Sequence, residues 1–221
     1  TFVFMSASAL QYDPTVTWEK LRVKQICEQK TLCDGSEPKV PGHIRFVCIS
    51  DTHTRTKGLA EKIPDGDVLI HAGDFTNVGE ISGVKQFSDF LHSLPHPHKI
   101  VIAGNHDLSF EPATFEATFA RFGRGKADEH RQAKQMLTGC TYLEDSGVEV
   151  HGIKIWGSPW TPWFYDWAFN AERGAECKAK WDLIPDDTQI LVTHGPPLGH
   201  GDLCDSGLRA GCLDLLQAVQ G

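Results

Sequence analysis

The chain lacks the features that mark several classes of protein at the level of sequence. Its 221 residues contain no apolar run near the roughly 20 residues needed to cross a bilayer. Lysine and arginine number 21 against 29 aspartates and glutamates, so the formal net charge is -8 and the basic excess that a nucleic-acid polymer requires is missing. We therefore expect neither a membrane nor a nucleic-acid polymer as partner.

The cysteines do not form the pattern of a disulfide framework. There are seven, an odd number, none are spaced C-x-x-C, and Cys48 lies inside an apolar run. The glycosylation pattern N-x-S/T is also absent. Together these absences indicate reduced thiols and predict a cytoplasmic location.

Common catalytic signatures are missing as well. The sequence contains no H-E-x-x-H, no G-x-S-x-G and no phosphate-binding P-loop. It also lacks the H-x-H-x-D-H run of the metallo-β-lactamase type of binuclear hydrolase. Any catalytic site in this chain must therefore be built from other residues.

Three short apolar runs in the first half of the chain are rich in β-branched residues and do not alternate with polar ones. This composition indicates strands buried on both faces of a parallel sheet. Between the second and third runs, Glu80–Leu94 has apolar residues at helical spacing. A strand, a helix and a strand give parallel pairing with a crossover, so the strand ends share one edge. The runs are Ile44–Ser50, Val68–Ala72 and Ile100–Ala103.

A residue able to bind a metal follows each of these strands, and a further strand, Gln189–Thr193, leads into another. Ligands of open α/β sheets bind at the carboxyl edge of the strands, so these side chains should converge. The residues are Asp51, His53, Asp74, Asn105, His106 and His194.

Their chemistry suits two divalent metal ions about 3.5–4 Å apart, an arrangement that clamps a phosphate. Such a site needs one bridging ligand, and the carboxylate of Asp74 is the natural candidate. Asp51 and His53 are one residue apart at a strand end, so both could reach one ion. Asn105 offers an amide oxygen and His194 a ring nitrogen to the second ion.

His106 directly follows a metal-binding residue, and we expect it to face the substrate, beside Asn105. Asp107 could hold the tautomer of His106 so that this histidine donates a proton. We therefore predict His106 and Asp107 as catalytic residues and His106 and Asn105 as substrate-binding residues.

The chain as a whole divides into an N-terminal arm, residues 1–41, and one domain, residues 42–221. Short predicted strands in the second half form a hairpin or meander on a second sheet. They are Thr141–Leu143, Val148–His151 and Ile153–Trp156. The other predicted helices are Trp18–Cys27, Phe110–Phe122, Asp128–Leu137, Glu172–Leu183 and Leu208–Val219.

An aromatic cluster between residues 160 and 169 has two interpretations. It could be a wall that stacks a nucleobase near the metals, or a proline-braced apolar cap over the second sheet, and we favour the cap. The cluster comprises Trp160, Trp163, Phe164, Trp167 and Phe169.

Four motifs in order, D-T-H, G-D, G-N-H-D and T-H-G-P-P, resemble those of the calcineurin-like metallophosphoesterases. The longer runs around them are similar to the brain-enriched metallophosphoesterase domain-containing proteins, relatives of class III cyclic nucleotide phosphodiesterases. The resemblance covers roughly residues 42–220. It implies an α/β fold of four αββα layers, a dinuclear site usually served by manganese, and hydrolysis of small phosphodiesters such as cyclic nucleotides. Iron and zinc suit the same ligands.

Residue by residue, the resemblance assigns metal binding to five positions and substrate contact to His106. The five are Asp51, His53, Asp74, Asn105 and His194. A later G-H-x-H motif of the family has no counterpart here, so we expect the C-terminal strands to be missing. The segment Gly199–Asp202 imitates that motif but comes too early. A nucleotide-binding scaffold or regulatory module with little or no turnover is therefore the alternative to a phosphodiesterase, and the sequence leaves the substrate and oligomeric state open.

Overall fold

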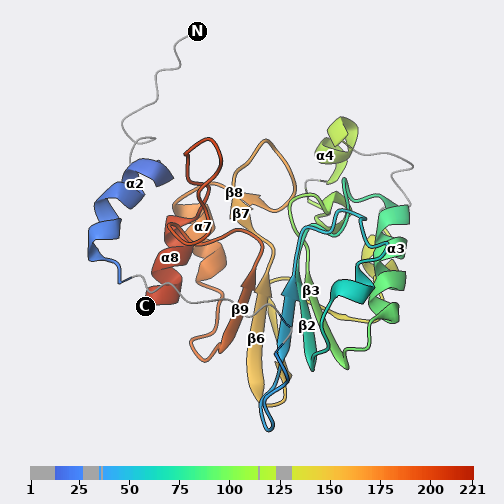
Figure 1. Cartoon of the computed structure of the whole chain (residues 1–221). Helices are drawn as coiled ribbons and strands as arrows, with labels where there is room; N and C mark the ends of the chain where they lie inside the picture. Colours follow the sequence, from blue (N-terminus) through green and yellow to red (C-terminus); the bar gives the residue numbers. More distant parts are fainter. Residues whose placement is uncertain (1–12, 27–34, 36, 114, 123–130) are drawn as a thin grey trace.

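Two β-sheets lie face to face, and helices cover the outer side of each (Figure 1). The computed structural model describes residues 13–26, 35, 37–113, 115–122 and 131–221. From one side to the other the layers are helices, sheet, sheet and helices, so the expected αββα sandwich is confirmed.

The first sheet is parallel throughout and has the order β1-β2-β3-β4. Its register pairs Phe46 with Val68, and Val68 with His98. Helix α3, Ile81–Ser93, makes the predicted crossover between β2 and β3. The strands are β1 (Phe46–Ile49), β2 (Val68–Ala72), β3 (His98–Ile102) and β4 (Thr141–Tyr142).

The second sheet contains an antiparallel hairpin and one parallel strand, in the order β5-β6-β9. A two-stranded parallel ribbon, β7 with β8, lies between Ser158 and Glu172 and was not expected from the sequence. The strands are β5 (Ser146–Val150), β6 (Ile153–Ser158), β9 (Ile190–Thr193), β7 (Thr161–Pro162) and β8 (Asn170–Ala171).

One strand prediction was wrong in its partner. We expected Thr141–Leu143 to belong to the second sheet, but Thr141 and Tyr142 pair with Ile100 and Val101 at the edge of the first. The Leu143 N–H also donates to the Val101 carbonyl at 2.8 Å. Short strands carry little information about their partner, because an edge position becomes available only once the other strands have paired.

Side chains of β2 alternate between two apolar cores, since successive residues of a strand point to opposite faces. Val68 and Ile70 pack between the sheets, while Leu69 packs beneath α3. His71 is fully buried, and its Nε2 lies 3.0 Å from the Thr52 hydroxyl, as expected for a core histidine. Both faces of the strand are therefore dry, which explains its continuous apolar run.

Helix α3 contributes several large side chains to the first core. Phe87 is fully buried and stacks on Phe75 with ring centroids 4.5 Å apart. Val84 and Leu91 lie on the same face and are also fully buried. Burying one such side chain contributes about 1.5–3 kcal/mol, so this face holds the helix against the sheet.

The remaining helices are shorter than expected because their sequence patterns continue into turns. Predicted helix Phe110–Phe122 is a helical turn followed by α4, and Leu208–Val219 becomes helical only at Leu213. Of the predicted Asp128–Leu137, residues 128–130 lie outside the described residues, as does Cys27 of Trp18–Cys27. The α-helices are α2 (Pro14–Leu21), α4 (Phe115–Phe122), α6 (Ala133–Met136), α7 (Ala175–Trp181) and α8 (Leu213–Gln220). Single 3₁₀ turns are Arg22–Lys24, Ala60–Lys62 and Leu108–Phe110.

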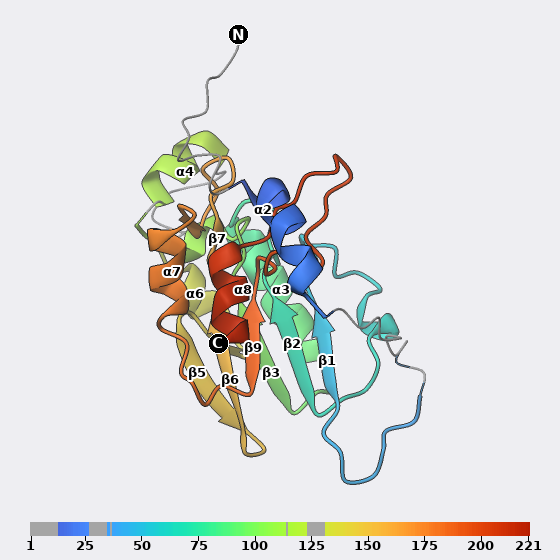
Figure 2. The same cartoon turned by 90° about the vertical axis from the view of Figure 1, so that its left-hand side faces the viewer.

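The N-terminal helix α2 packs on the far end of the chain, beside α8 (Figure 2). Asp13 caps it by accepting the Val16 N–H at 2.9 Å. Trp18 is buried against Leu198 and Leu216. The described part of the arm is thus tied to the segment between β9 and α8. Across the described ranges, no helix has the length and apolar character needed to cross a bilayer.

Candidate metal centre

The turns after β1 and β2 run side by side and carry the first three candidate residues. The Asp51 N–H donates to the Gly73 carbonyl and the His53 N–H to the Asp74 carbonyl, both at 3.0 Å. Asp51, His53 and Asp74 have φ of 53°, 42° and 58°, the left-handed region that costs non-glycine residues energy. Such strain persists only where the surroundings impose it, and here it directs these side chains toward one point.

Asp74 lies at the centre of two groups of possible metal ligands. One group is His53, Asp74 and His106, and the other is Asp51, Asp74 and His194; within each, the ligand atoms lie within 4.8 Å of one another. His53 Nε2 is 3.7 Å from Asp74 Oδ2, whereas His194 Nε2 is 3.4 Å from Oδ1. The two oxygens of Asp74 thus face different histidines, as a bridging carboxylate requires.

Asp51 and His53 occur in different groups, Asp51 with Asp74 and His194, and His53 with Asp74 and His106. The expectation that Asp51 and His53 share one ion stays a prediction.

Three histidines present the same ring nitrogen to Asp74. Each uses Nδ1 to bond a backbone carbonyl: His53 that of Thr76 at 3.0 Å, His106 that of Asn77 at 2.7 Å. His194 Nδ1 bonds the Ala72 carbonyl at 2.8 Å. Since a carbonyl only accepts, Nδ1 carries a hydrogen, and Nε2 is the nitrogen left to hold either a second proton or a metal ion. Metal-binding histidines are commonly held in this way.

His194 and Asn105 meet although they are 89 positions apart. The Asn105 amide oxygen is 2.9 Å from His194 Nε2. Burial lowers the pKa of His194, but the hydrogen bond and charge of Asp74 outweigh it and raise the pKa to about 9. Burial alone would raise the pKa of Asp74, yet His194 and the His106 N–H hold it below its ordinary value. In the metal-free chain, a proton on His194 therefore occupies the position that a cation would take.

Asp107 has a different role from the one expected. Its carboxylate accepts the N–H groups of Asp74, Gly104 and Thr76, each at 2.9 Å, and the Thr76 hydroxyl at 2.7 Å. The Asn77 carbonyl, rather than Asp107, contacts the His106 ring. Asp107 thus joins the turns after β2 and β3. Burial and the nearby charge of Asp74 raise the pKa of Asp107 to about 7.

Sequence reasoning did not find Thr76 and Asn77, which orient His53 and His106. They act through main-chain carbonyls, and every residue has one, so no residue type signals this role.

The aromatic segment 160–169 divides into a buried and an exposed part. Phe169 packs into the core of the first sheet, and Trp160 packs against that core and against the one on the outer side of the second sheet, in part as the cap interpretation predicts. Trp167 stacks on the His106 ring, with centroids 4.1 Å apart at 30°. Trp163 and Phe164 are exposed. The segment therefore reaches the candidate metal centre through Trp167 and through the Ala168 N–H, which donates to the Asn105 carbonyl at 3.1 Å.

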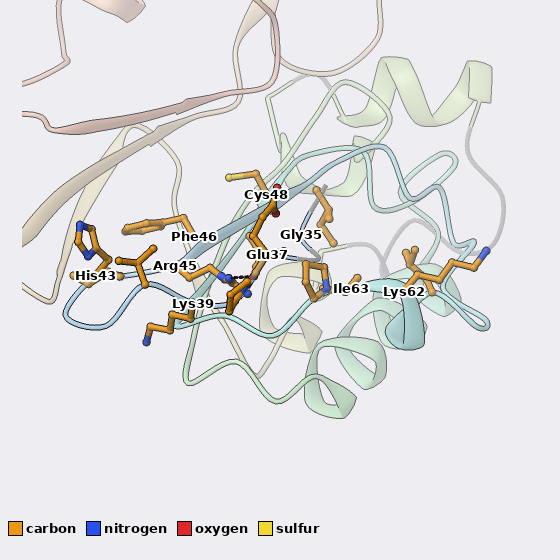
Figure 3. Close-up of a pocket in the computed structure, with 16 residues that line it drawn as sticks. Gly35, Glu37, Lys39, His43, Arg45, Phe46, Cys48, Lys62 and Ile63 are labelled. Atoms are coloured by element: carbon orange, nitrogen blue, oxygen red, sulfur yellow. Dashed lines mark hydrogen bonds between the residues drawn. The ribbon is translucent and has the colours of Figure 1, made fainter. Parts of the chain in front are cut away.

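Two other features lie apart from these residues. His200 is exposed and meets the edge of Trp18, with ring centroids 6.0 Å apart. A cavity of about 640 Å³ lies along β1, between residues 35–49 and 59–64 (Figure 3). Arg45 and Cys48 line it, but none of the candidate residues does.

Known proteins match the part of the chain that contains the candidate metal centre. The family described as "Calcineurin-like phosphoesterase" matches residues 44–217. "Metallophosphoesterase domain-containing protein 1" of Homo sapiens is 49% identical over 191 residues, covering 83% of this chain and 58% of that protein. A "UPF0046 protein" of Caenorhabditis elegans is 41% identical over 223 residues, covering 98% of this chain and 78% of its own length.

A crystal structure of another protein superposes with a TM-score of 0.54 at 12% identity, over 79% of each chain. At that identity the likeness concerns the fold alone. The chain thus spans little more than half of the human relative, and the matched region contains all the candidate metal ligands.

Proposed function

Since this chain belongs to the calcineurin-like phosphoesterase family, we propose that it is a metal-dependent phosphodiesterase that uses two divalent ions. The single observation that carries the proposal is the position of Asp74 between two groups of ligands, with a different histidine facing each of its oxygens.

The residues present fit two divalent cations. Asp74 is buried at 3% exposure, and its negative charge, which His194 balances in the metal-free chain, would attract cations. His53, His106 and His194 direct Nε2 toward Asp74, and a deprotonated Nε2 is a good ligand for such a cation. Carboxylate, amide and imidazole ligands suit manganese, iron or zinc, and we favour manganese.

Ions bound there would supply positive charge for a phosphate and activate a water molecule. The protein would contribute geometry and a proton. Asp51, His53, Asp74, Asn105 and His194 would hold the ions. His106 is about a third exposed, with its side chain at 30%, and its Nδ1 is held by Asn77. A proton on His106 Nε2 could therefore pass to the leaving oxygen.

The proposed substrates are small phosphodiesters, with cyclic nucleotides favoured. The Trp167 indole lies against His106, beside the site, where it could stack on the base of a nucleotide, and this supports a substrate that contains a base. The same stack would serve the second candidate, a nucleotide-binding scaffold with little turnover. We also propose a cytoplasmic location, because Cys48, Cys140, Cys177, Cys204 and Cys212 are all free thiols.

The test is manganese-dependent hydrolysis of a chromogenic phosphodiester by the wild-type chain and by Asp74→Asn. Asparagine tolerates the left-handed backbone at this position, so the fold should persist. We expect at least about a hundredfold loss of rate, because neither group of ligands keeps its bridging carboxylate. Asp89→Asn, an exposed change on α3, is the matched control.

Undiminished hydrolysis by folded Asp74→Asn would overturn the proposal. Binding of a nucleoside monophosphate without hydrolysis by the wild type would instead support the scaffold.

A further inference from the structure

Two buried cysteines face each other on the outer side of the second sheet, apart from the candidate metal centre. Cys177 lies in the first turn of α7, and Cys212 is the N-cap residue of α8; both have 0% exposure. Their sulfur atoms and one Asp214 carboxylate oxygen lie within 4.8 Å of one another. The proposed hydrolysis uses neither cysteine.

Two N–H groups donate to the sulfur of Cys212: the Trp181 indole at 3.3 Å and the Leu215 backbone at 3.5 Å. The Cys177 thiol donates to the Ala171 carbonyl at 3.4 Å and its sulfur lies within 4.8 Å of that of Cys212, whose own thiol is 3.9 Å from Asp214 Oδ2. The neighbouring Cys177 thiol, with the bonds from Leu215 and Trp181, lowers the pKa of Cys212 to about 7 despite burial. The nearby Cys212 and burial raise the pKa of Cys177. Cys212 is therefore the member of the pair that forms a thiolate, and the thiolate is the reactive form.

A metal site is the weaker interpretation of this cluster. A structural zinc ion needs four ligands, and this group offers three. Asp214 Oδ2 is also engaged, because it accepts the Gly174 N–H at 3.0 Å. The two sulfur atoms, in contrast, lie within 4.8 Å of each other, and a disulfide needs only these two.

We infer that Cys177 and Cys212 form a reversible disulfide when a peroxide oxidises Cys212. The Cys212 sulfur attacks one peroxide oxygen: an S–O bond forms, the O–O bond breaks, and the leaving hydroxide takes a proton to become water. The Cys177 sulfur then attacks the oxidised sulfur: the S–S bond forms, the S–O bond breaks, and water leaves with the Cys177 proton. Two thiols are oxidised and one peroxide becomes two waters.

The bond would join α7 to the segment that follows His194. The Cys212 N–H donates to the Pro196 carbonyl at 3.0 Å, and the Leu198 N–H donates to the Cys212 carbonyl at 2.9 Å. Oxidation would thus brace the backbone two residues beyond a candidate metal ligand. The inference itself rests on the cysteine geometry and stands apart from the proposed activity.

The test uses the full, reduced chain treated with hydrogen peroxide, blocked with iodoacetamide and digested with trypsin without reductant. Mass spectrometry should detect residues 174–178 linked to residues 210–221, a species that dithiothreitol removes. Cys204→Ser, at an exposed cysteine between the two, should leave the link unchanged.

Cys177→Ser should abolish the link and leave Cys212 as a sulfenic acid that dimedone traps. Cys212→Ser should abolish both the link and the adduct, and serine is a good N-cap residue, so α8 should persist. Circular dichroism of each variant separates loss of the link from loss of the fold. The inference is overturned if folded wild-type chain keeps both thiols, links them to other cysteines, or proceeds to sulfinic acid at Cys212.

Discussion

At the scale of single residues, the candidate metal centre depends on backbone carbonyls as much as on side chains. Ala72, Thr76 and Asn77 each bond the Nδ1 of one histidine, so the end of β2 and the turn after it determine the orientation of three rings. Residues in that turn can change identity while keeping this function, whereas a shift of its backbone would move all three rings together.

Binding of manganese should strengthen as pH rises. The pKa of His194 is raised to about 9 by Asp74, above its ordinary 6.5. In the metal-free chain, the protonated pair therefore stabilises the fold fully below about pH 6.5, and this contribution is lost as pH rises through about 9. Manganese must displace that proton, so its affinity should increase by up to about a hundredfold between pH 6.5 and 8.5.

Isothermal titration with manganese at the two pH values measures this change. Repeating it in buffers of different ionisation enthalpy should reveal proton release. Equal affinities at both pH values would contradict the prediction.

Gly104→Ala should damage the centre without unfolding the chain. A β-carbon at Gly104 would lie 2.6 Å from the Asp74 nitrogen and 2.7 Å from His194 Cε1, so both must move. We expect manganese affinity and hydrolysis to fall at least about tenfold, with a stability loss of about 1–3 kcal/mol.

The control is Gly201→Ala, which meets no atom within 4 Å, although its φ of 72° adds a backbone cost that Gly104 does not have. Titration and thermal melting of both variants give the comparison. A Gly104→Ala variant that binds manganese and hydrolyses substrate normally would show that the close approach of the turns after β2 and β3 is not required for the metal centre.

At the scale of elements, the buried strands were the most predictable part of the chain. Val68–Ala72 is dry on both faces, so every residue of it is apolar or, at His71, hydrogen-bonded, and the run matches β2 residue for residue. The convergence of Asp51, Asp74 and Asn105 followed because β1, β2 and β3 are parallel and end at a common edge, whereas His194 reaches them from β9 of the second sheet.

The bounds of helices and the pairing of short strands were less predictable, for physical reasons. Leu208 has a helical apolar spacing with Leu215 but lies in an exposed loop, and its side chain is 61% exposed. Helix α8 begins only after its N-cap residue, Cys212. Tyr142 joined the first sheet because its partner Val101 lies at an edge that only the assembled fold creates.

Phe87→Ala should destabilise the fold by about 3–5 kcal/mol. Phe87 is fully buried on α3 and contacts the rings of His71, Phe75 and Phe90. Removing it leaves a cavity between α3 and the first sheet. Phe164→Ala, which removes an exposed ring at 55% exposure, should change stability little.

Urea denaturation of the two variants, followed by circular dichroism, measures the difference. A stability loss below about 1 kcal/mol for Phe87→Ala would show that α3 does not depend on this contact.

At the scale of the whole molecule, the candidate metal centre combines residues from both sheets. Asp51 and Asp74 come from the first sheet, whereas His194 follows β9 of the second. The close contact of His194 with Ala72 is one of the links between the two sheets at their carboxyl edge. Ions bound there would therefore connect both halves of the sandwich.

Removing the metals should lower the stability of the whole chain. A ligand that binds only the folded state at a hundred times its Kd stabilises by about 2.7 kcal/mol. For a chain of this size, each kcal/mol corresponds to about 2–4 °C of Tm. Manganese should thus raise Tm by about 5–10 °C over the chain treated with a chelator, because it neutralises the buried carboxylates and draws the two sheets together at His194. In Asp74→Asn most of this rise should disappear, and in Asp89→Asn it should remain. A rise of equal size in all three proteins would mean that manganese acts elsewhere, and the two sheets would then hold together at this edge without ions.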